Sequence, residues 1–197
     1  ALAAAADRSG RTYDPLVAGA FTAAGAPWLG ELESLDPWST VLAMEPRPRR
    51  LLNGDDLDEA LTVVADFVDM KSPFMAGHSR RCADLAKSAG ALLACDADTV
   101  VALRRAALVH DLGTGAVPNS IWDKPGPLTA AELDRVQVHP MLTEQMLRRL
   151  TALAAVGSIA AAHHERADGS GYHRGTATAP GDLAVNILAA CDVYVGM

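Results

Sequence analysis

Residues 55–69 have the sequence Asp-Asp-Leu-Asp-Glu-Ala-Leu-Thr-Val-Val-Ala-Asp-Phe-Val-Asp. Within this segment the apolar side chains recur at steps of three and four residues, at Leu57, Leu61, Val64, Phe67 and Val68. Such spacing places the apolar side chains on one stripe of an α-helix. The segment therefore predicts an amphipathic helix with one buried stripe, and it indicates a fold built by packing helices against one another.

The helical pattern continues through the rest of the chain. Thr129 and Glu132 have the spacing of a capping box, and Pro140 forces a new helix to start after His139. The expected helices cover residues 55–71, 78–93, 96–113, 129–139, 140–150, 152–165 and 183–195. No segment alternates between apolar and polar residues as a half-buried strand does. The predicted fold class is therefore all-α.

Composition limits the classes of function. Of the 197 residues 50% are hydrophobic and 5% are aromatic, which favours packed helices over sheets. The formal net charge of −7 argues against a nucleic-acid-binding surface, which is normally basic. No apolar run has the length of a membrane span, and no secretory signal opens the sequence. Three cysteines without metal-site spacing suit a reducing, cytoplasmic compartment and apolar packing: Cys82, Cys95 and Cys191.

Residues 1–50 differ from the rest of the chain. The run Glu45-Pro-Arg-Pro-Arg-Arg50 is typical of a linker, and the helical pattern begins after it. We therefore expect an N-terminal segment over residues 1–50 and a second domain over residues 51–197. The chain starts without methionine and stops within an apolar run, so we expect the natural protein to continue on both sides.

Histidines and aspartates that suit metal ligation recur along the predicted helices. None of the six histidines precedes residue 78, and the intervals are about one helical hairpin. The pattern consists of His78, His110-Asp111, His139, His163-His164 and Asp192. Each helix would contribute one or two ligands to a shared interior point. The alternative is a bundle whose buried histidines pair with carboxylates, which leaves the adjacent pair His163-His164 unexplained.

The glycine-rich loop after His164 has the chemistry of an anion site. Residues 165–172 supply a cation, a carboxylate and free backbone amides. These groups suit a ligand that bears phosphate.

Six segments form an ordered set. They are Ala76-Gly-His-Ser-Arg80, Ala107-Leu-Val-His-Asp-Leu-Gly113, Trp122-Asp-Lys-Pro-Gly-Pro-Leu-Thr129, Val138-His-Pro140, His163-His-Glu-Arg-Ala-Asp-Gly-Ser-Gly-Tyr172 and Ala190-Cys-Asp-Val-Tyr194. In this order and spacing, residues of about 55–197 resemble the HD superfamily of metal-dependent phosphohydrolases, specifically its HD-GYP branch. Any one segment is a weak match, whereas the ordered set is specific.

The resemblance implies an HD-domain helical bundle of about six to eight helices with a metal site in its core. It also implies two divalent metal ions, with Asp111 bridging them. The implied ligands are His78, His110, Asp111, His139, His163, His164 and Asp192. Iron is the frequent metal of the family and manganese is also found, while the donor types suit zinc as well.

The implied activity is that of a metal-dependent phosphohydrolase, a phosphodiesterase on cyclic di-GMP or a related nucleotide. A water activated by both metals would attack phosphorus. The implied catalytic residues are Asp111, Arg166 and Lys124. The implied substrate-binding residues are Thr114, Lys124, Arg166, Gly171 and Tyr172. The expected partner is a nucleotide or another small phosphodiester, with no nucleic acid and no membrane.

The chain departs from the family pattern near the expected site. Thr114 stands where the family has a lysine that contacts phosphate, and His173 replaces the proline of Gly-Tyr-Pro. Upstream of the first histidine, Asp69 is the candidate for a third metal. These departures favour an alternative function: a catalytically weak, ligand-sensing regulatory module in a multidomain signalling or transcription-regulator protein.

A fainter similarity lies in the first fifty residues. Gly10-Arg-Thr-Tyr-Asp-Pro15 is similar to the segment that normally ends an HD-GYP domain. We therefore expect residues 1–50 to be the tail of a preceding HD-like domain plus a linker, or else a substitute for the missing tail of the second domain. Flanking regulatory domains and a homodimer are further expectations.

Overall fold

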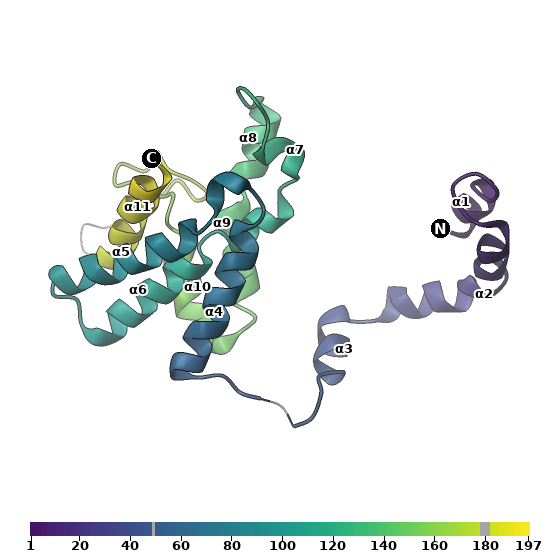
Figure 1. Cartoon of the computed structure of the whole chain (residues 1–197), viewed down its shortest axis with the longest axis horizontal. Helices are drawn as coiled ribbons and strands as arrows, with labels where there is room; N and C mark the ends of the chain where they lie inside the picture. Colours follow the sequence, from purple (N-terminus) through teal and green to yellow (C-terminus); the bar gives the residue numbers. More distant parts are fainter. Residues whose placement is uncertain (49, 178–181) are drawn as a thin grey trace. The chain divides into compact units, whose positions relative to one another are not determined.

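A computed structural model describes residues 1–48, 50–177 and 182–197. The chain forms two compact units, Ala1–Leu51 and Leu52–Met197 (Figure 1). Helices and turns make up both units, and no strand forms within the described ranges. The predicted all-α class is confirmed. None of the described helices combines the length and the apolar character that crossing a membrane requires.

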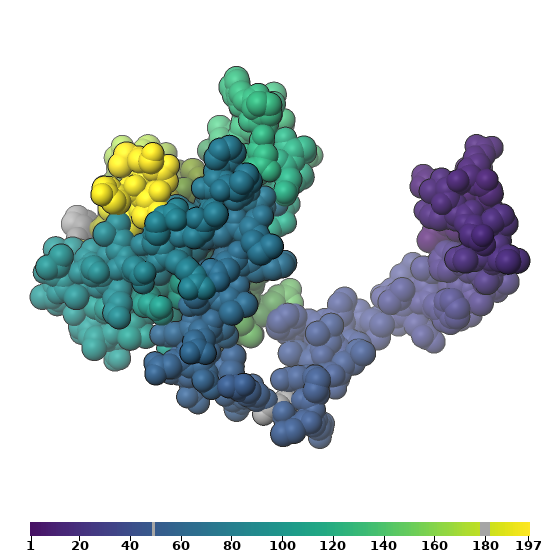
Figure 2. Space-filling model, in the orientation of Figure 1, coloured from purple at the N-terminus to yellow at the C-terminus, as the bar shows by residue number. Residues whose placement is uncertain are grey.

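The first unit contains the helices α1 (Leu2–Asp7), α2 (Pro15–Ser34) and α3 (Pro37–Ala43). Asp14 caps α2, because its Oδ1 accepts hydrogen bonds from the amides of Leu16 (2.9 Å) and Val17 (3.2 Å). Only Ala18 and Gly25 are buried among the residues of these three helices. The unit therefore has very little core, and in Figure 2 its atoms (purple to blue) form a thin strip.

The second unit has eight α-helices in the described residues, within the predicted six to eight. They are α4 (Gly54–Asp69), α5 (His78–Leu92), α6 (Ala97–Val109), α7 (Asn119–Trp122), α8 (Ala130–Gln137), α9 (His139–Leu147), α10 (Ala154–Ala160) and α11 (Leu183–Gly196). Three 3₁₀ turns connect some of them: η1 (Pro73–Met75), η2 (Leu112–Ala116) and η3 (Thr151–Leu153). The sequence did not predict α7, which is too short to show a period. The helix expected over 152–165 ends at Ala160, because its last residues form the turn that holds two histidines.

Local side-chain chemistry sets where the helices begin. Asp96 caps α6 by accepting a hydrogen bond from the Thr99 amide at 2.9 Å. The predicted capping box of α8 is confirmed, with Thr129 and Glu132 bonding to each other's backbone amides. Proline occupies the first turn of α9, where its missing N–H costs nothing, so α9 starts at His139.

The core lies between α5, α6 and the helices packed on them. In Figure 1, α5 and α6 form an antiparallel pair, and α4, α10 and α11 also contact this pair. Small side chains such as Ala86, Ala106 and Ala107 are fully buried there, which lets the helix backbones approach closely. Two of the cysteines, Cys82 and Cys191, are buried free thiols in this core. The core therefore fixes the helix ends that face one another at the candidate site.

The predicted apolar stripe on α4 is wrong at one residue, Phe67, which is not buried. Leu61 is 5% exposed, but Phe67 is 76% exposed. The buried face of α4 runs through Leu61, Ala65 and Asp69, at steps of four residues. Phe67 lies two residues from Ala65, which is about 200° around the helix. Its ring therefore faces away from the core.

Candidate metal centre

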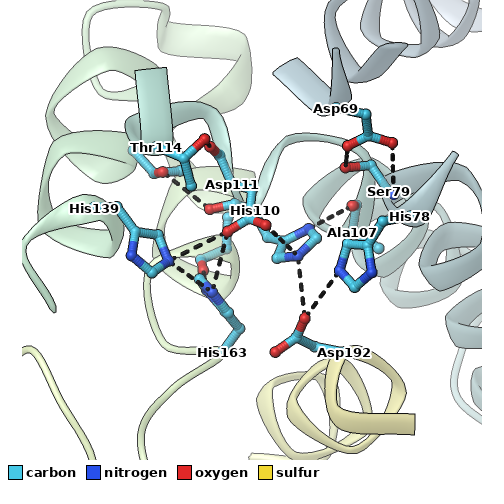
Figure 3. Close-up of polar contacts among 12 residues, drawn as sticks. Asp69, His78, Ser79, Ala107, His110, Asp111, Thr114, His139, His163 and Asp192 are labelled. Carbon is cyan, nitrogen blue, oxygen red and sulfur yellow. Dashed lines mark hydrogen bonds and ion pairs between the residues drawn. The ribbon is translucent and has the colours of Figure 1, made fainter. Parts of the chain in front are cut away.

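The seven predicted ligands come from five separate places in the second unit, and the fold brings all of them together. They are buried or half-buried residues near helix ends or on α11, and Figure 3 labels all of them except His164. Three overlapping groups have ligand atoms within 4.8 Å of one another: His139, His163 and His164; His78, His110 and Asp192; His110, Asp111 and His163. The groups share His110 and His163, so they form one cluster.

Two carboxylates lie at the centre of this cluster. Asp111 directs Oδ1 toward His139 Nε2 (3.2 Å) and His163 Nε2 (3.7 Å), and Oδ2 toward His110 Nε2 (3.5 Å). Its two oxygens thus face different imidazoles, as a carboxylate that bridges two ions would do. On the other side of His110, Asp192 Oδ1 lies 3.1 Å from His78 Nε2 and 3.5 Å from His110 Nε2 (Figure 3). Asp192 Oδ2 is 3.9 Å from His164 Nδ1.

Three of the imidazoles are oriented in the same way by the backbone. His110 Nδ1 donates to the carbonyl of Ala107 at 2.8 Å, and His139 Nδ1 donates to the carbonyl of Val136 at 2.7 Å. His163 Nδ1 donates to the carbonyl three residues before it at 2.6 Å. A carbonyl only accepts, so each Nδ1 must carry the hydrogen. This fixes the tautomer that leaves Nε2 with a lone pair directed into the cluster.

The Nε2 atoms of these three imidazoles face no hydrogen-bond donor among the residues that the structure describes. His110 Nε2 is buried and has no hydrogen-bond partner among the described residues. His139 Nε2 and His163 Nε2 lie 3.2 Å apart, although the tautomers above direct a lone pair from each. Lone pairs that face each other in a buried site are unfavourable unless a cation lies between them. The donor set, imidazole nitrogen plus carboxylate oxygen, therefore fits iron, manganese or zinc.

The electrostatics of the cluster also favour a cation. Burial opposes ionisation of Asp111 and of Asp192, but the surrounding imidazoles outweigh it and hold both pKa values well below the usual range. Burial, with neighbouring histidines, lowers the pKa of His163 well below its ordinary value and that of His164 to about 4. At neutral pH the cluster thus combines the ionised carboxylates of Asp111 and Asp192 with the neutral imidazoles of His163 and His164, the protonation states that metal ligands need.

His110 behaves differently from its neighbours. Burial disfavours its protonated form, but Asp111 and Asp192 outweigh burial and raise its pKa to about 9. A proton on His110 would therefore compensate part of the anionic charge when no other cation is present.

Other buried polar residues support the seven ligands, among them Asp69, the residue that the sequence offered for a third metal. Asp69 accepts hydrogen bonds from the Ser79 amide at 3.0 Å and the Ser79 hydroxyl at 2.7 Å, in the first turn of α5 beside His78 (Figure 3). Both Asp69 oxygens are thus engaged by Ser79, and Asp69 belongs to none of the three groups above. Thr143 contacts the segment after α6. Its only sequence signal is its place one helical turn after His139.

The predicted substrate-binding residues differ from one another in burial and in the groups that they contact. Thr114 is buried, and its hydroxyl donates to the carbonyl of Asp111 at 2.7 Å, so it closes the turn after that ligand. Lys124 Nζ lies 2.7 Å from Glu132 Oε2 at the start of α8. Arg166 is exposed and lines a groove of about 490 Å³ against α11, where Tyr194 also lies.

Gly171 and Tyr172 lie directly against the cluster. A Cβ on Gly171 would be 2.3 Å from the carbonyl oxygen of His164, so only glycine permits this approach. The Tyr172 amide donates to the same carbonyl at 3.1 Å. The Tyr172 ring lies over His164, with centroids 4.5 Å apart and planes inclined by 32°. The loop therefore covers one side of the cluster, and burial raises the pKa of the Tyr172 phenol.

Comparison with known proteins agrees with this geometry. The family model described as HD domain matches residues 62–195. The chain is 39% identical to the 3'3'-cGAMP-specific phosphodiesterase 3 of Vibrio cholerae, over 85% of this chain and 36% of that protein. It is 31% identical to the cyclic di-GMP phosphodiesterase response regulator RpfG of Xanthomonas campestris, over 69% of this chain and 36% of that protein.

A third relative matches a shorter part of the chain. It is a cyclic di-GMP phosphodiesterase of Pseudomonas aeruginosa, 44% identical over 45% of this chain and 22% of that protein. The chain thus spans about a third or less of the length of these three relatives.

Proposed function

The chain belongs to the HD domain family, and we propose that its histidine–aspartate cluster is a two-metal centre that hydrolyses a phosphodiester bond of a cyclic dinucleotide. The observation that carries this proposal is the set of buried Nε2 atoms without protein donors. His110 Nε2 has no hydrogen-bond partner in the described residues, and the Nε2 atoms of His139 and His163 face each other at 3.2 Å. A pair of divalent cations would satisfy all of them.

The proposed ligands divide between the two carboxylates. His139 and His163 lie nearest to Asp111, His78 lies nearest to Asp192, and His110 lies 3.5 Å from both. His164 completes the set. Bound divalent metals would lower the pKa of a water molecule and neutralise charge on the phosphoryl oxygens. We favour iron, and manganese or zinc suits the same donors.

The chain's own residues prepare the site for this chemistry. The Nδ1–carbonyl hydrogen bonds hold three imidazoles in one tautomer and one orientation, so little reorganisation accompanies ligand binding. Asp111 is ionised, so its negative charge would help to hold the divalent metals without first losing a proton. Tyr172 covers His164 and restricts the access of bulk water from that side.

The proposed substrate class is a cyclic dinucleotide, either cyclic di-GMP or 3'3'-cGAMP. The names of the relatives support this class, and cytosolic-type free thiols support a cytoplasmic setting for such a ligand. Arg166 and Lys124 are the proposed contacts to phosphate, with Gly171 and Tyr172 forming the adjoining wall. Lys124 would exchange its ion pair with Glu132 for the ligand.

A second candidate is a regulatory module that binds metal and ligand but turns over poorly. Two observations favour it. The Thr114 hydroxyl is committed to the Asp111 carbonyl, and the Lys124 ammonium is paired with Glu132. Two of the residues proposed to bind substrate, Thr114 and Lys124, are therefore occupied by internal interactions.

The first unit is proposed to be the tail of a preceding HD-like domain, joined by a linker. The match to the Vibrio cholerae relative extends into the first unit, because 85% of this chain is more than the second unit alone can supply, so this segment has a counterpart in that relative. Flanking regulatory domains and a homodimer belong to the same proposal.

Turnover assays separate the two candidates. The full chain, loaded with Mn²⁺ or Fe²⁺, is tested with cyclic di-GMP, with 3'3'-cGAMP and with bis(p-nitrophenyl) phosphate. The phosphodiesterase requires cleavage that a chelator abolishes and that Asp192→Asn loses, while the exposed control Asp84→Asn retains it. Loaded protein that binds a cyclic dinucleotide but cleaves none of the three leaves only the regulatory module.

A further inference from the structure

A buried hydroxyl connects the two segments that present three of the proposed ligands. Thr143 lies on α9, one turn after His139, and its side chain is fully buried. Its Oγ1 donates to the carbonyl of His110 at 3.0 Å and accepts a hydrogen bond from the Gly113 amide at 2.9 Å. The two partners enclose Asp111 in the chain. One hydroxyl therefore contacts both sides of the turn that presents His110 and Asp111.

The backbone of this turn also lies directly against α9. A Cβ built on Gly113 would be 2.0 Å from the carbonyl oxygen of His139 and 2.9 Å from the Thr143 amide nitrogen. No side chain fits there, so glycine is required by the close approach and not by its backbone angles. The ligand atoms Asp111 Oδ1 and His139 Nε2, which lie 3.2 Å apart, belong to the two segments that meet at this contact.

We propose that Thr143 is a positioning residue for the metal centre. Its hydroxyl fixes the turn of residues 110–113 against α9, and so holds His110 and Asp111 in register with His139. Without the hydroxyl, the buried Gly113 N–H and His110 C=O lose a partner, and the turn moves to find another. Such a movement displaces two ligands relative to the third. The inference rests on the proposed metal centre and deepens it.

The test compares three variants of the full chain. Thr143→Val keeps the shape and removes the hydroxyl, whereas Thr143→Ser keeps the hydroxyl. Thr62→Val is the matched control, because the Thr62 hydroxyl on α4 donates to the Asp58 carbonyl at 2.7 Å, away from the cluster. The dissociation constant for Mn²⁺ is measured by competition with a chelator, and the visible absorption of the Co²⁺-loaded protein reports ligand geometry.

The expected effect of Thr143→Val is a dissociation constant about 10- to 100-fold higher, the range seen when groups that orient metal ligands are removed. An altered Co²⁺ spectrum should accompany it. The dissociation constants of Thr143→Ser and Thr62→Val should stay within about threefold of the wild-type value, since both variants keep a hydroxyl at position 143. A merely structural role would instead lower the unfolding temperature of the chelated protein and leave the Mn²⁺ affinity unchanged, which overturns the proposal.

The remaining outcomes separate this inference from the metal centre itself. Wild-type protein that binds no Mn²⁺ refutes the metal centre and the inference together. Wild-type binding with an unaffected Thr143→Val refutes the inference alone. Should Thr143→Val fail to fold, hydrogen exchange of the Gly113 amide in the wild type decides: protection agrees with the hydrogen bond to Thr143, and exchange at the rate of an open amide contradicts it.

Discussion

Asp111→Asn is the substitution that most directly perturbs the centre of the cluster. Asparagine has the shape of aspartate but lacks its charge. The Asp111 carboxylate lies 3.2–3.7 Å from the Nε2 atoms of His139, His163 and His110. A cation ligated by this carboxylate would lie about 2 Å from its oxygen, and we use the longer separation of about 4 Å so that the electrostatic attraction is a lower bound. At an effective dielectric constant of about 20, one pair of unit charges at that distance contributes about 4 kcal/mol.

A loss of about 4 kcal/mol corresponds to a dissociation constant roughly a thousandfold higher. The assay is competition between the full chain and a chelator for Mn²⁺, with circular dichroism to show that the helices persist. Asp84→Asn is the matched control, because Asp84 is exposed on α5 and belongs to none of the candidate groups. Binding by Asp111→Asn within threefold of the wild type would refute the idea that this carboxylate holds a cation.

Three further predictions concern the loop, the histidines and the core. Gly171→Ala puts a Cβ 2.3 Å from a backbone oxygen, so the thermal unfolding midpoint should fall by several degrees, whereas Gly115→Ala, with nothing within 4 Å, should leave it unchanged. Equal midpoints would contradict the close contact of the loop. In chelated protein the free energy of unfolding should rise between about pH 4 and pH 6.5. The reason is that His164 has a pKa of about 4 in the folded chain, so it stays neutral in this pH range, whereas the same histidine binds a proton in the unfolded chain. Urea titrations should show a shallower rise for His164→Gln, and identical slopes would show that His164 is not desolvated. Leu61→Ala should cost about 2–5 kcal/mol of unfolding free energy and Phe67→Ala less than about 0.5 kcal/mol, which chemical denaturation measures. Similar losses for both would place Phe67 in the core.

The sequence predicts the helices of the second unit well because their signals are local. Caps and prolines mark the starts of α6, α8 and α9, and these starts agree with the structure to within a residue or two. The error at Phe67 has a physical cause. Apolar residues on two faces of α4 satisfy the same three- and four-residue steps, and only the packing partners decide which face is buried.

The candidate site was predictable as a set of residues but not as a geometry. The order of histidines and aspartates indicates that they converge, and the fold does bring them together. The Nδ1 hydrogen bonds to carbonyls three residues earlier depend on where each helix ends, which the sequence leaves uncertain by a few residues. Thr143 bonds to residues 30 and 33 positions away, and Ser79 bonds to Asp69 on the preceding helix, so no local pattern identifies their contributions.

The metal content of the full chain, purified without oxygen and then reconstituted with Fe²⁺, Mn²⁺ or Zn²⁺, tests the central idea most directly. Plasma mass spectrometry on the desalted protein should find two ions per chain, and substitution of Asp111 and Asp192 by asparagine should remove them. Protein that retains no ion under any of these conditions would mean that the imidazoles and carboxylates pair only with one another.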